Sequence, residues 1–200
     1  MVLRDDDVGG QWLHTDEDED VAASIRHALR SLRFVSDDIQ AWKWVALSLH
    51  SALQGACVCH LVTTAVPIGA VTKQNAKEWI SYFEACRDDE EVRPPRTYLL
   101  SLPDLLKEVR KPHSAGDRSN ECGIAITDSE LAWLRRFHDE IRNQFSHFEP
   151  RGWTVEISGL PQLGSVISRI IRDVLLAGWA FRHTDDRWKA RLLTDLKTLS

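Results

Sequence analysis

Residues 37–65 have the sequence DDIQAWKWVALSLHSALQGACVCHLVTTA. Side chains recur in this stretch at spacings of three and four residues, the period that places them on one face of an α-helix. The stripe consists of Trp42, Val45, Ala46, Leu49, Ala52, Leu53, Ala56, His60 and Leu61. Further apolar residues lie off the stripe, which indicates a helix that is contacted on several sides. The sequence therefore predicts a central, most buried helix on which the other helices pack.

The same periodicity predicts helices on both sides of this stretch. They are 16–35, 74–87 with Trp79, Tyr82 and Phe83 turned inward, 103–109, 128–148, 160–182 and a last helix from about 186 to 199. Residues 152–159 alternate between apolar and polar side chains and predict one short extended segment. Six or seven helices with short connections predict an all-α, up-and-down helical bundle.

The charge is distributed unevenly along the 200 residues. Residues 1–20 contain eight acidic side chains and Arg4 as their one basic side chain, a charge of −7, whereas the whole chain carries −5. The remainder is therefore mildly basic, although the net charge argues against a protein that coats DNA nonspecifically. We predict that residues 1–15 form an acidic, disordered leader and that residues 16–200 form a single helical domain.

The apolar and cysteine patterns bear on location. The longest apolar stretch, 55–71, contains His60, two threonines and Pro67, and falls short of a membrane-spanning run. The four cysteines are too few and too irregularly spaced for the disulfide framework of a small secreted protein. The acidic N-terminus does not resemble a signal peptide. We therefore expect a cytoplasmic protein with reduced thiols and no membrane contact.

The predicted helix 128–148 carries the clearest chemical pattern. Its core stripe consists of Leu131, Leu134, Phe137, Ile141, Phe145 and Phe148. Asp139, Asn143 and His147 follow one another at four-residue steps in a separate row, so the asparagine can orient the imidazole and the aspartate can orient the asparagine. Arg142 lies between this row and the core stripe. An imidazole that titrates near neutrality and a phosphate-binding guanidinium together suit transesterification of RNA.

Other candidate residues lie on the central helix. His50 and Gln54 are four residues apart, a spacing typical of a buried hydrogen-bonded pair. If the two side chains face helix 128–148, they would help to position the catalytic residues. Cys57, Cys59 and His60 resemble half of a zinc site, but helical geometry turns the two thiols about 200° apart. Small buried thiols are the favoured interpretation, and we predict neither a metal nor a cofactor.

Arg142-Asn143-x-x-x-His147 resembles the Arg-x(4–6)-His motif of HEPN domains, a superfamily of small helical bundles. The resemblance extends over roughly residues 20–182 and includes the Trp42-x-Trp44 pattern of the central helix. It implies a homodimer in which two motif helices face each other and cleave RNA without a metal. His147 would then activate the ribose 2′-hydroxyl or protonate the leaving oxygen, and Arg142 would hold the charge of the phosphorane. Many members are toxins or defence effectors regulated by a neutralising protein partner.

Three functions stay open. The first is a metal-independent endoribonuclease with RNA as its substrate. The second is a HEPN-like module without catalysis that binds RNA, a nucleotide or a protein partner. The third is a helical interaction domain in which the motif plays no part. The loops between residues 88 and 127 exceed those of a minimal family domain, and they either cover the site or decorate the bundle.

Overall fold

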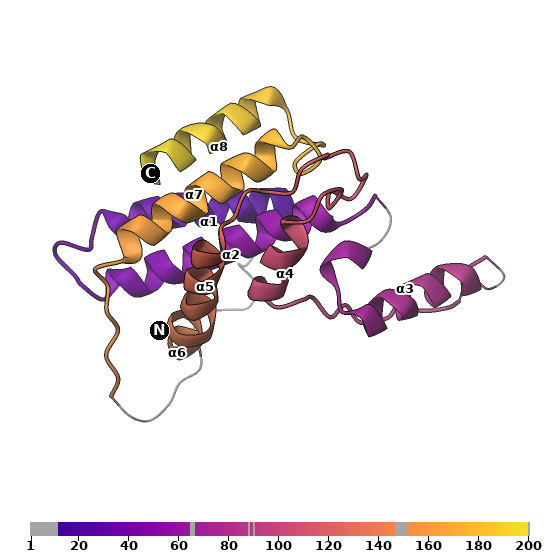
Figure 1. Cartoon of the computed structure of the whole chain (residues 1–200), viewed down its shortest axis with the longest axis horizontal. Helices are drawn as coiled ribbons and strands as arrows, with labels where there is room; N and C mark the ends of the chain where they lie inside the picture. The colour runs from indigo at the N-terminus through magenta and orange to yellow at the C-terminus, as the bar shows by residue number, and fades with distance from the viewer. Residues whose placement is uncertain (1–11, 65–66, 88, 90, 147–151, 200) are drawn as a thin grey trace, which may run out of the picture.

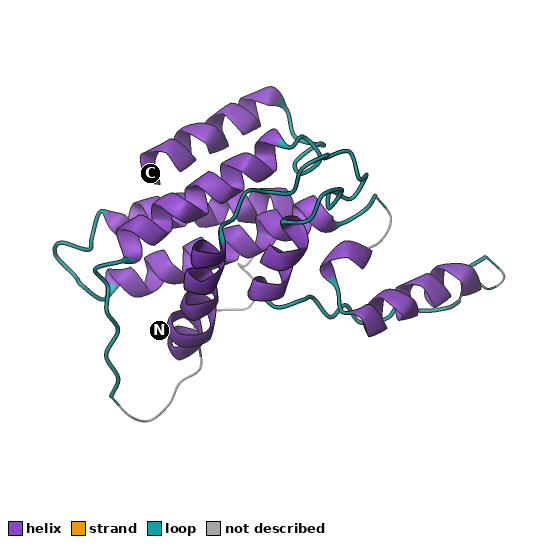
Figure 2. Cartoon of the chain, in the orientation of Figure 1, coloured by secondary structure: helices purple, strands orange, loops and turns teal. Residues whose placement is uncertain are grey.

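The computed structural model describes residues 12–64, 67–87, 89, 91–146 and 152–199. Within these residues the chain is all-α, and Val71 and Leu99 form an isolated bridge rather than a strand pair (Figure 2). The predicted all-α bundle is confirmed. The predicted leader 1–15 falls mostly outside the described residues, and no helix among the described ones is long and apolar enough to span a membrane.

Helix α2 (Ala41–Leu61) is the centre of the bundle, as its sequence predicts (Figure 1). Its buried side chains lie on more than one face, because neighbouring helices contact it from several directions. α1 (Glu17–Leu32) packs along it and contributes Val21 and Ile25, both fully buried. The two helices approach closely at Gly55, where an added Cβ would lie 2.7 Å from Cγ2 of Val21.

Two C-terminal helices complete the body of the bundle. α7 (Leu160–Leu176) packs on α2, and α8 (Asp186–Leu199) packs on α7 and α1 (Figure 1). α7 ends earlier than the predicted helix 160–182 because the chain turns at Gly178, whose φ of 87° is the left-handed conformation that glycine adopts without strain. Asp185 caps α8 by accepting a hydrogen bond from the backbone N–H of Trp188 (2.6 Å).

A third group of short helices crosses α2 and carries the motif. α4 (Leu102–Val109) and α5 (Asp128–Arg136) pack on each other, and a π-helical turn (Phe137–Arg142) and α6 (Asn143–Ser146) continue α5. The Thr-x-x-Glu pattern of residues 127–130 predicts a capping box, and one opens α5: Thr127 Oγ1 accepts from the N–H of Glu130 (3.2 Å), and Glu130 Oε2 accepts from the N–H of Thr127 (2.8 Å). Phe148, the last member of the predicted core stripe, lies outside the described residues.

Helix α3 (Lys73–Ala85) corrects one prediction, because it projects away from the bundle (Figure 1). Trp79, Tyr82 and Phe83 pack on one another with ring centroids 5.2–5.9 Å apart, and 39% of the Phe83 surface stays exposed. These three rings cover part of one another's apolar surface within α3, rather than packing into the core of the bundle. Asn75 holds α3 in place, since its side chain bonds the backbone of Arg96 and Tyr98 at 2.8 Å each.

Residues 152–158 form no strand in the structure, so of the two forms that the sequence allows for the extended segment, a short strand or a linker, it is a linker that leads to α7. Phe145 and Trp153 pack edge to face with centroids 5.0 Å apart, which fastens this segment to the motif helix. Residues 147–151, between them, are outside the described part of the chain.

Replacing Gly55 by alanine should destabilise the protein by about 1–2 kcal/mol, because the new methyl group overpacks the α1–α2 contact. Val21 cannot easily move away, since it is fully buried and its branched side chain has one preferred rotamer. Urea denaturation measures the change in free energy. Gly152→Ala is the matched control, because a Cβ there meets nothing within 4 Å. Equal stability of the two variants would contradict the close packing at Gly55.

Candidate functional site

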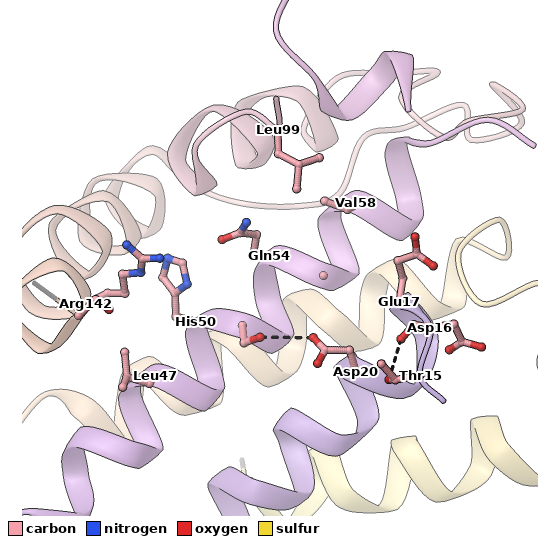
Figure 3. A pocket seen from close by; sticks show the side chains of 13 residues that line it. Thr15, Asp16, Glu17, Asp20, Leu47, His50, Gln54, Val58, Leu99 and Arg142 are labelled. Carbon is pink, nitrogen blue, oxygen red and sulfur yellow. Dashed lines mark hydrogen bonds between the residues drawn. The ribbon is translucent and has the colours of Figure 1, made fainter. Parts of the chain in front are cut away.

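A cavity of about 740 Å³ opens between the N-terminal end of α1, the middle of α2 and the end of the π-helical turn (Figure 3). We call it the Arg142 pocket; its charged and polar lining includes Asp16, Glu17, Asp20, His50, Gln54 and Arg142. A volume of this size is within the usual range for small-molecule sites. The structure thus brings three of the sequence-predicted residues, Arg142, His50 and Gln54, into one cavity.

Arg142 owes its position to the π-helical turn. The N–H of Asn143 bonds to the carbonyl of His138, five residues earlier, instead of the carbonyl four residues earlier. Such π-bulges occur mostly as single turns within α-helices, frequently at functional sites. The turn changes the angular spacing along the helix, so the regular α-helical spacing on which the predicted core stripe and polar row depend does not hold between Phe137 and Arg142.

The predicted polar row is arranged differently around Arg142. Its Nη1 donates a hydrogen bond to Oδ1 of Asn143 (3.0 Å), so the asparagine orients the guanidinium. Asp139 is exposed to solvent. His147, the predicted acid-base residue, lies outside the described residues, and its pairing with Asn143 stays a prediction.

His50 and His138 form a pair that the sequence did not predict. Nε2 of His50 and Nδ1 of His138 are 2.8 Å apart and share a hydrogen bond; the two rings meet edge to edge, with centroids 5.1 Å apart and planes 20° from parallel. Phe137 covers His50 from the π-helical turn, with ring centroids 6.0 Å apart. His50 therefore pairs with the motif helix and not with Gln54, which lines the pocket separately.

Both imidazoles are held neutral. Burial, together with the neighbouring His138 and Arg142, lowers the pKa of His50 to about 3. Burial also lowers the pKa of His138; Arg142 acts in the same direction, while Asp139 and Asp104 oppose it. Because a neutral imidazole has one N–H and one acceptor nitrogen, two neutral rings can share a hydrogen bond as donor and acceptor. At neutral pH the charge beside the pair is that of Arg142.

The opposite end of the pocket is acidic. Asp16, Glu17 and Asp20 line it from the first turn of α1, in a row that Figure 3 shows away from Arg142. Asp16 caps α1 through a hydrogen bond from the N–H of Glu19 (2.8 Å), and Asp20 accepts one from Ser51 (3.4 Å). The pocket therefore has a guanidinium at one end and carboxylates at the other.

No protein-family model, curated protein sequence or solved structure matches this chain. The chemistry of the Arg142 pocket must therefore be inferred from its own side chains.

The described part of the segment between residues 88 and 127 contributes one residue, Leu99, to the pocket lining. The segment that follows α4 packs on the C-terminal end of α2 instead, where the N–H of Gly116 donates to the carbonyl of His60 (2.9 Å). Its Ile124 and Ile126 are buried in the core.

Cys57 and Cys59 are buried thiols, as their spacing on a helix predicts. Burial raises the pKa of Cys57 to about 12, and Sγ of Cys59 donates to a carboxylate oxygen of Asp18 (3.5 Å). His60 turns toward Ser114, with Nε2 2.9 Å from Oγ. Among the described residues no three histidine, cysteine or acidic side chains are grouped as metal ligands.

Acid should destabilise the folded chain through His50. Its pKa is about 3 in the folded protein and near 6.5 when unfolded, so between these values the unfolded chain binds a proton that the folded chain does not. Stability should therefore fall as pH drops below about 6.5, by roughly 1.4 kcal/mol per pH unit from this residue. Urea denaturation at pH 7.5, 6.0 and 5.0 measures it.

The matched variants are His50→Gln, which removes the titrating ring, and His27→Gln, which removes an exposed one. His50→Gln should reduce the pH dependence to the part that His60 and His138 contribute, since their pKa values are also lowered in the folded protein, and His27→Gln should not reduce it. Parallel curves for the wild type and His50→Gln would show that folding does not lower the pKa of His50.

Proposed function

We propose that this protein is a metal-independent endoribonuclease in which Arg142 and His147 act on an RNA phosphodiester. The observation that supports it best is the placement of Arg142 in an open cavity of about 740 Å³, with its guanidinium oriented by Asn143. A guanidinium held in this way can donate two parallel hydrogen bonds to phosphate oxygens. The resemblance of the Arg142-to-His147 motif to that of HEPN domains supports the same chemistry.

The proposed reaction needs a base and an acid. One imidazole takes the proton of the ribose 2′-hydroxyl, and the oxygen attacks the adjacent phosphorus. Arg142 stabilises the negative charge that builds on the phosphorane oxygens. A second imidazole protonates the departing 5′-oxygen, so the products are a 2′,3′-cyclic phosphate and a free 5′-hydroxyl. Two copies of the chain, paired through the motif helix, supply two copies of His147.

Purified protein should cleave RNA in excess chelator and leave 2′,3′-cyclic phosphate ends, because no step requires a metal ion. Mass spectrometry of the fragments identifies the ends. A substrate with a single ribose, placed in an otherwise deoxyribose strand, should be cut only after that ribose. Cleavage that needs added Mg²⁺, or that leaves 5′-phosphate ends, would contradict the proposed mechanism.

The acidic end of the pocket favours a second candidate, a HEPN-like module without catalysis. Asp16, Glu17 and Asp20 attract positive charge, which suits a lysine- or arginine-rich segment of a protein partner better than a polyanion. Under this alternative a short oligolysine peptide binds in calorimetric titration, Asp20→Asn weakens that binding, and RNA stays intact. The first candidate predicts RNA cleavage whether or not the peptide binds.

A ribonuclease of this kind acts where cellular RNA and reduced thiols occur, so the proposal includes a cytoplasmic location. The four cysteines, all free, suit that compartment. The proposal also includes a neutralising protein partner that covers the Arg142 pocket, because unrestrained cleavage of RNA harms the cell that makes the enzyme. Co-purification of a second protein that abolishes cleavage tests this part.

A further inference from the structure

We propose that the Arg142 pocket binds a tetrahedral phosphate oxyanion together with one proton, which the His50–His138 pair takes up. This inference rests on the proposed function for the source of the phosphate, an RNA backbone, but the binding step does not require cleavage. It assigns the two histidines a role that the motif Arg142 to His147 does not contain.

The geometry of the pair sets the number of protons. With both rings neutral, one N–H lies between Nε2 of His50 and Nδ1 of His138, which are 2.8 Å apart. One further proton can bind to an outer nitrogen and turn the contact into a charge-assisted hydrogen bond. A second further proton would place two N–H groups against each other. The pair can therefore accept one proton and keep its hydrogen bond.

The surrounding charges determine when that proton binds. His50 is 3% exposed and lines the pocket beside Arg142, whose positive charge disfavours an imidazolium. His138 also lies near Arg142, while Asp139 and, from α4, Asp104 act on it in the opposite direction. In the free protein, burial and the guanidinium keep the pair uncharged.

The carboxylates of α1 belong to the same electrostatic environment. Asp16, Glu17 and Asp20 line the pocket, and α2 residues on the lining extend from Leu47 to Val58. Asp20 is the nearest of them to the pair along α2, because it accepts a hydrogen bond from Ser51 (3.4 Å), the residue after His50. These carboxylates weaken anion binding, but the charges that act on His50 and His138 are those of Arg142, Asp139 and Asp104.

An oxyanion bound to Arg142 changes which protonation state of the His50–His138 pair is favoured. Its negative charge offsets the guanidinium and attracts an imidazolium, so the protonated pair becomes favourable. Linkage makes the effect reciprocal, since a proton that binds more tightly in the complex also tightens anion binding. The affinity for an oxyanion should therefore rise as pH falls.

Calorimetric titration tests the inference with two probes whose charges are constant between pH 5.5 and 7.5. Thymidylyl-thymidine carries one phosphodiester and, without a 2′-hydroxyl, cannot undergo transesterification; sulfate represents a free tetrahedral anion. Each titration is run in two buffers of different ionisation enthalpy, which reports the protons taken up. Thymidylyl-thymidine should bind roughly tenfold more tightly at pH 5.5 than at pH 7.5, with net proton uptake.

Substituted proteins show whether His50 and His138 are the groups that take up the proton. His50→Gln/His138→Gln should lose the uptake and keep less than a twofold pH dependence. His27→Gln, at an exposed position on α1, should behave as the wild type. Asp20→Asn should bind the anion more tightly at every pH and retain the uptake, which separates the imidazole pair from the acidic wall.

Three results would overturn the inference: no binding of either anion, binding of the wild type without proton uptake, or an unchanged pH dependence in the double variant. If the double variant does not fold, the two-buffer measurement on the wild type decides alone. Uptake with sulfate but no binding of the dinucleotide supports the inference and contradicts the proposed ribonuclease. Uptake with the dinucleotide in a chain that never cleaves RNA supports it while excluding catalysis.

Discussion

Replacing His147 by alanine should lower kcat for RNA cleavage by about 10²- to 10⁴-fold, the usual contribution of general acid-base catalysis. The substitution removes an imidazole that moves a proton in the transition state and leaves the guanidinium that holds the substrate. KM should therefore change far less than kcat. Single-turnover cleavage of an oligonucleotide with one ribose measures the rate of the chemical step.

His27→Ala is the matched control for His147→Ala, because it removes an exposed imidazole from α1, outside the pocket lining. Its rate should equal that of the wild type. Mixing His147→Ala with an excess of Arg142→Ala should restore part of the activity if one composite site draws on both copies of the chain. An unchanged rate in His147→Ala would exclude this residue from catalysis.

Replacing Arg142 by alanine should lower kcat/KM for RNA cleavage by about 10²- to 10³-fold, as loss of a transition-state donor does in other enzymes. The guanidinium contributes charge and a two-pronged donor geometry, which Asn143 fixes through a 3.0 Å hydrogen bond. Arg142→Lys keeps the charge but not the geometry, so its rate should lie between those of the wild type and Arg142→Ala.

The control for Arg142→Ala is Arg30→Ala, which removes an exposed guanidinium from the last turn of α1. Both variants lose one positive charge, so a general electrostatic effect on RNA binding would lower both activities alike. A loss confined to Arg142→Ala assigns the effect to the pocket. Equal losses in the two variants would contradict a specific role for Arg142.

The bundle could be predicted from the sequence wherever local patterns decide the structure. The stripe from Trp42 to Leu61 repeats with the helical period, and the segment forms the buried α2. Thr127 and Glu130 are three residues apart, and they form the predicted capping box because both bonds lie within one turn. Both features arise from residues that are close together in the chain, so the sequence is enough to predict them.

The candidate site depends on contacts that local patterns do not encode. His50 and His138 are separated by 88 positions, and their hydrogen bond follows from how the π-helical turn crosses α2. The sequence does contain one signal for this site: His138 and Arg142 are four residues apart, a spacing that places two side chains on the same face of an α-helix. The extra residue in the π-helical turn has no signature in the sequence that we can identify.

Helix α3 shows the same limit for apolar residues. The helical period predicts that Trp79 and Phe83 share a face, and they do stack with centroids 5.9 Å apart. Periodicity does not say which surface covers that face. In the structure the ring of Tyr82, on the same helix, packs against both Trp79 and Phe83 and covers part of that face.

The attachment of α3 through Asn75 also bears on local unfolding of the protein. Asn75 is the one buried residue described in α3, and its amide joins the helix to the backbone of Arg96 and Tyr98. Few core contacts are lost when this arm unfolds, so it constitutes a separate cooperative unit with a small opening free energy. We therefore expect its amide protons to exchange with solvent far sooner than those of α2, while the body of the bundle stays folded.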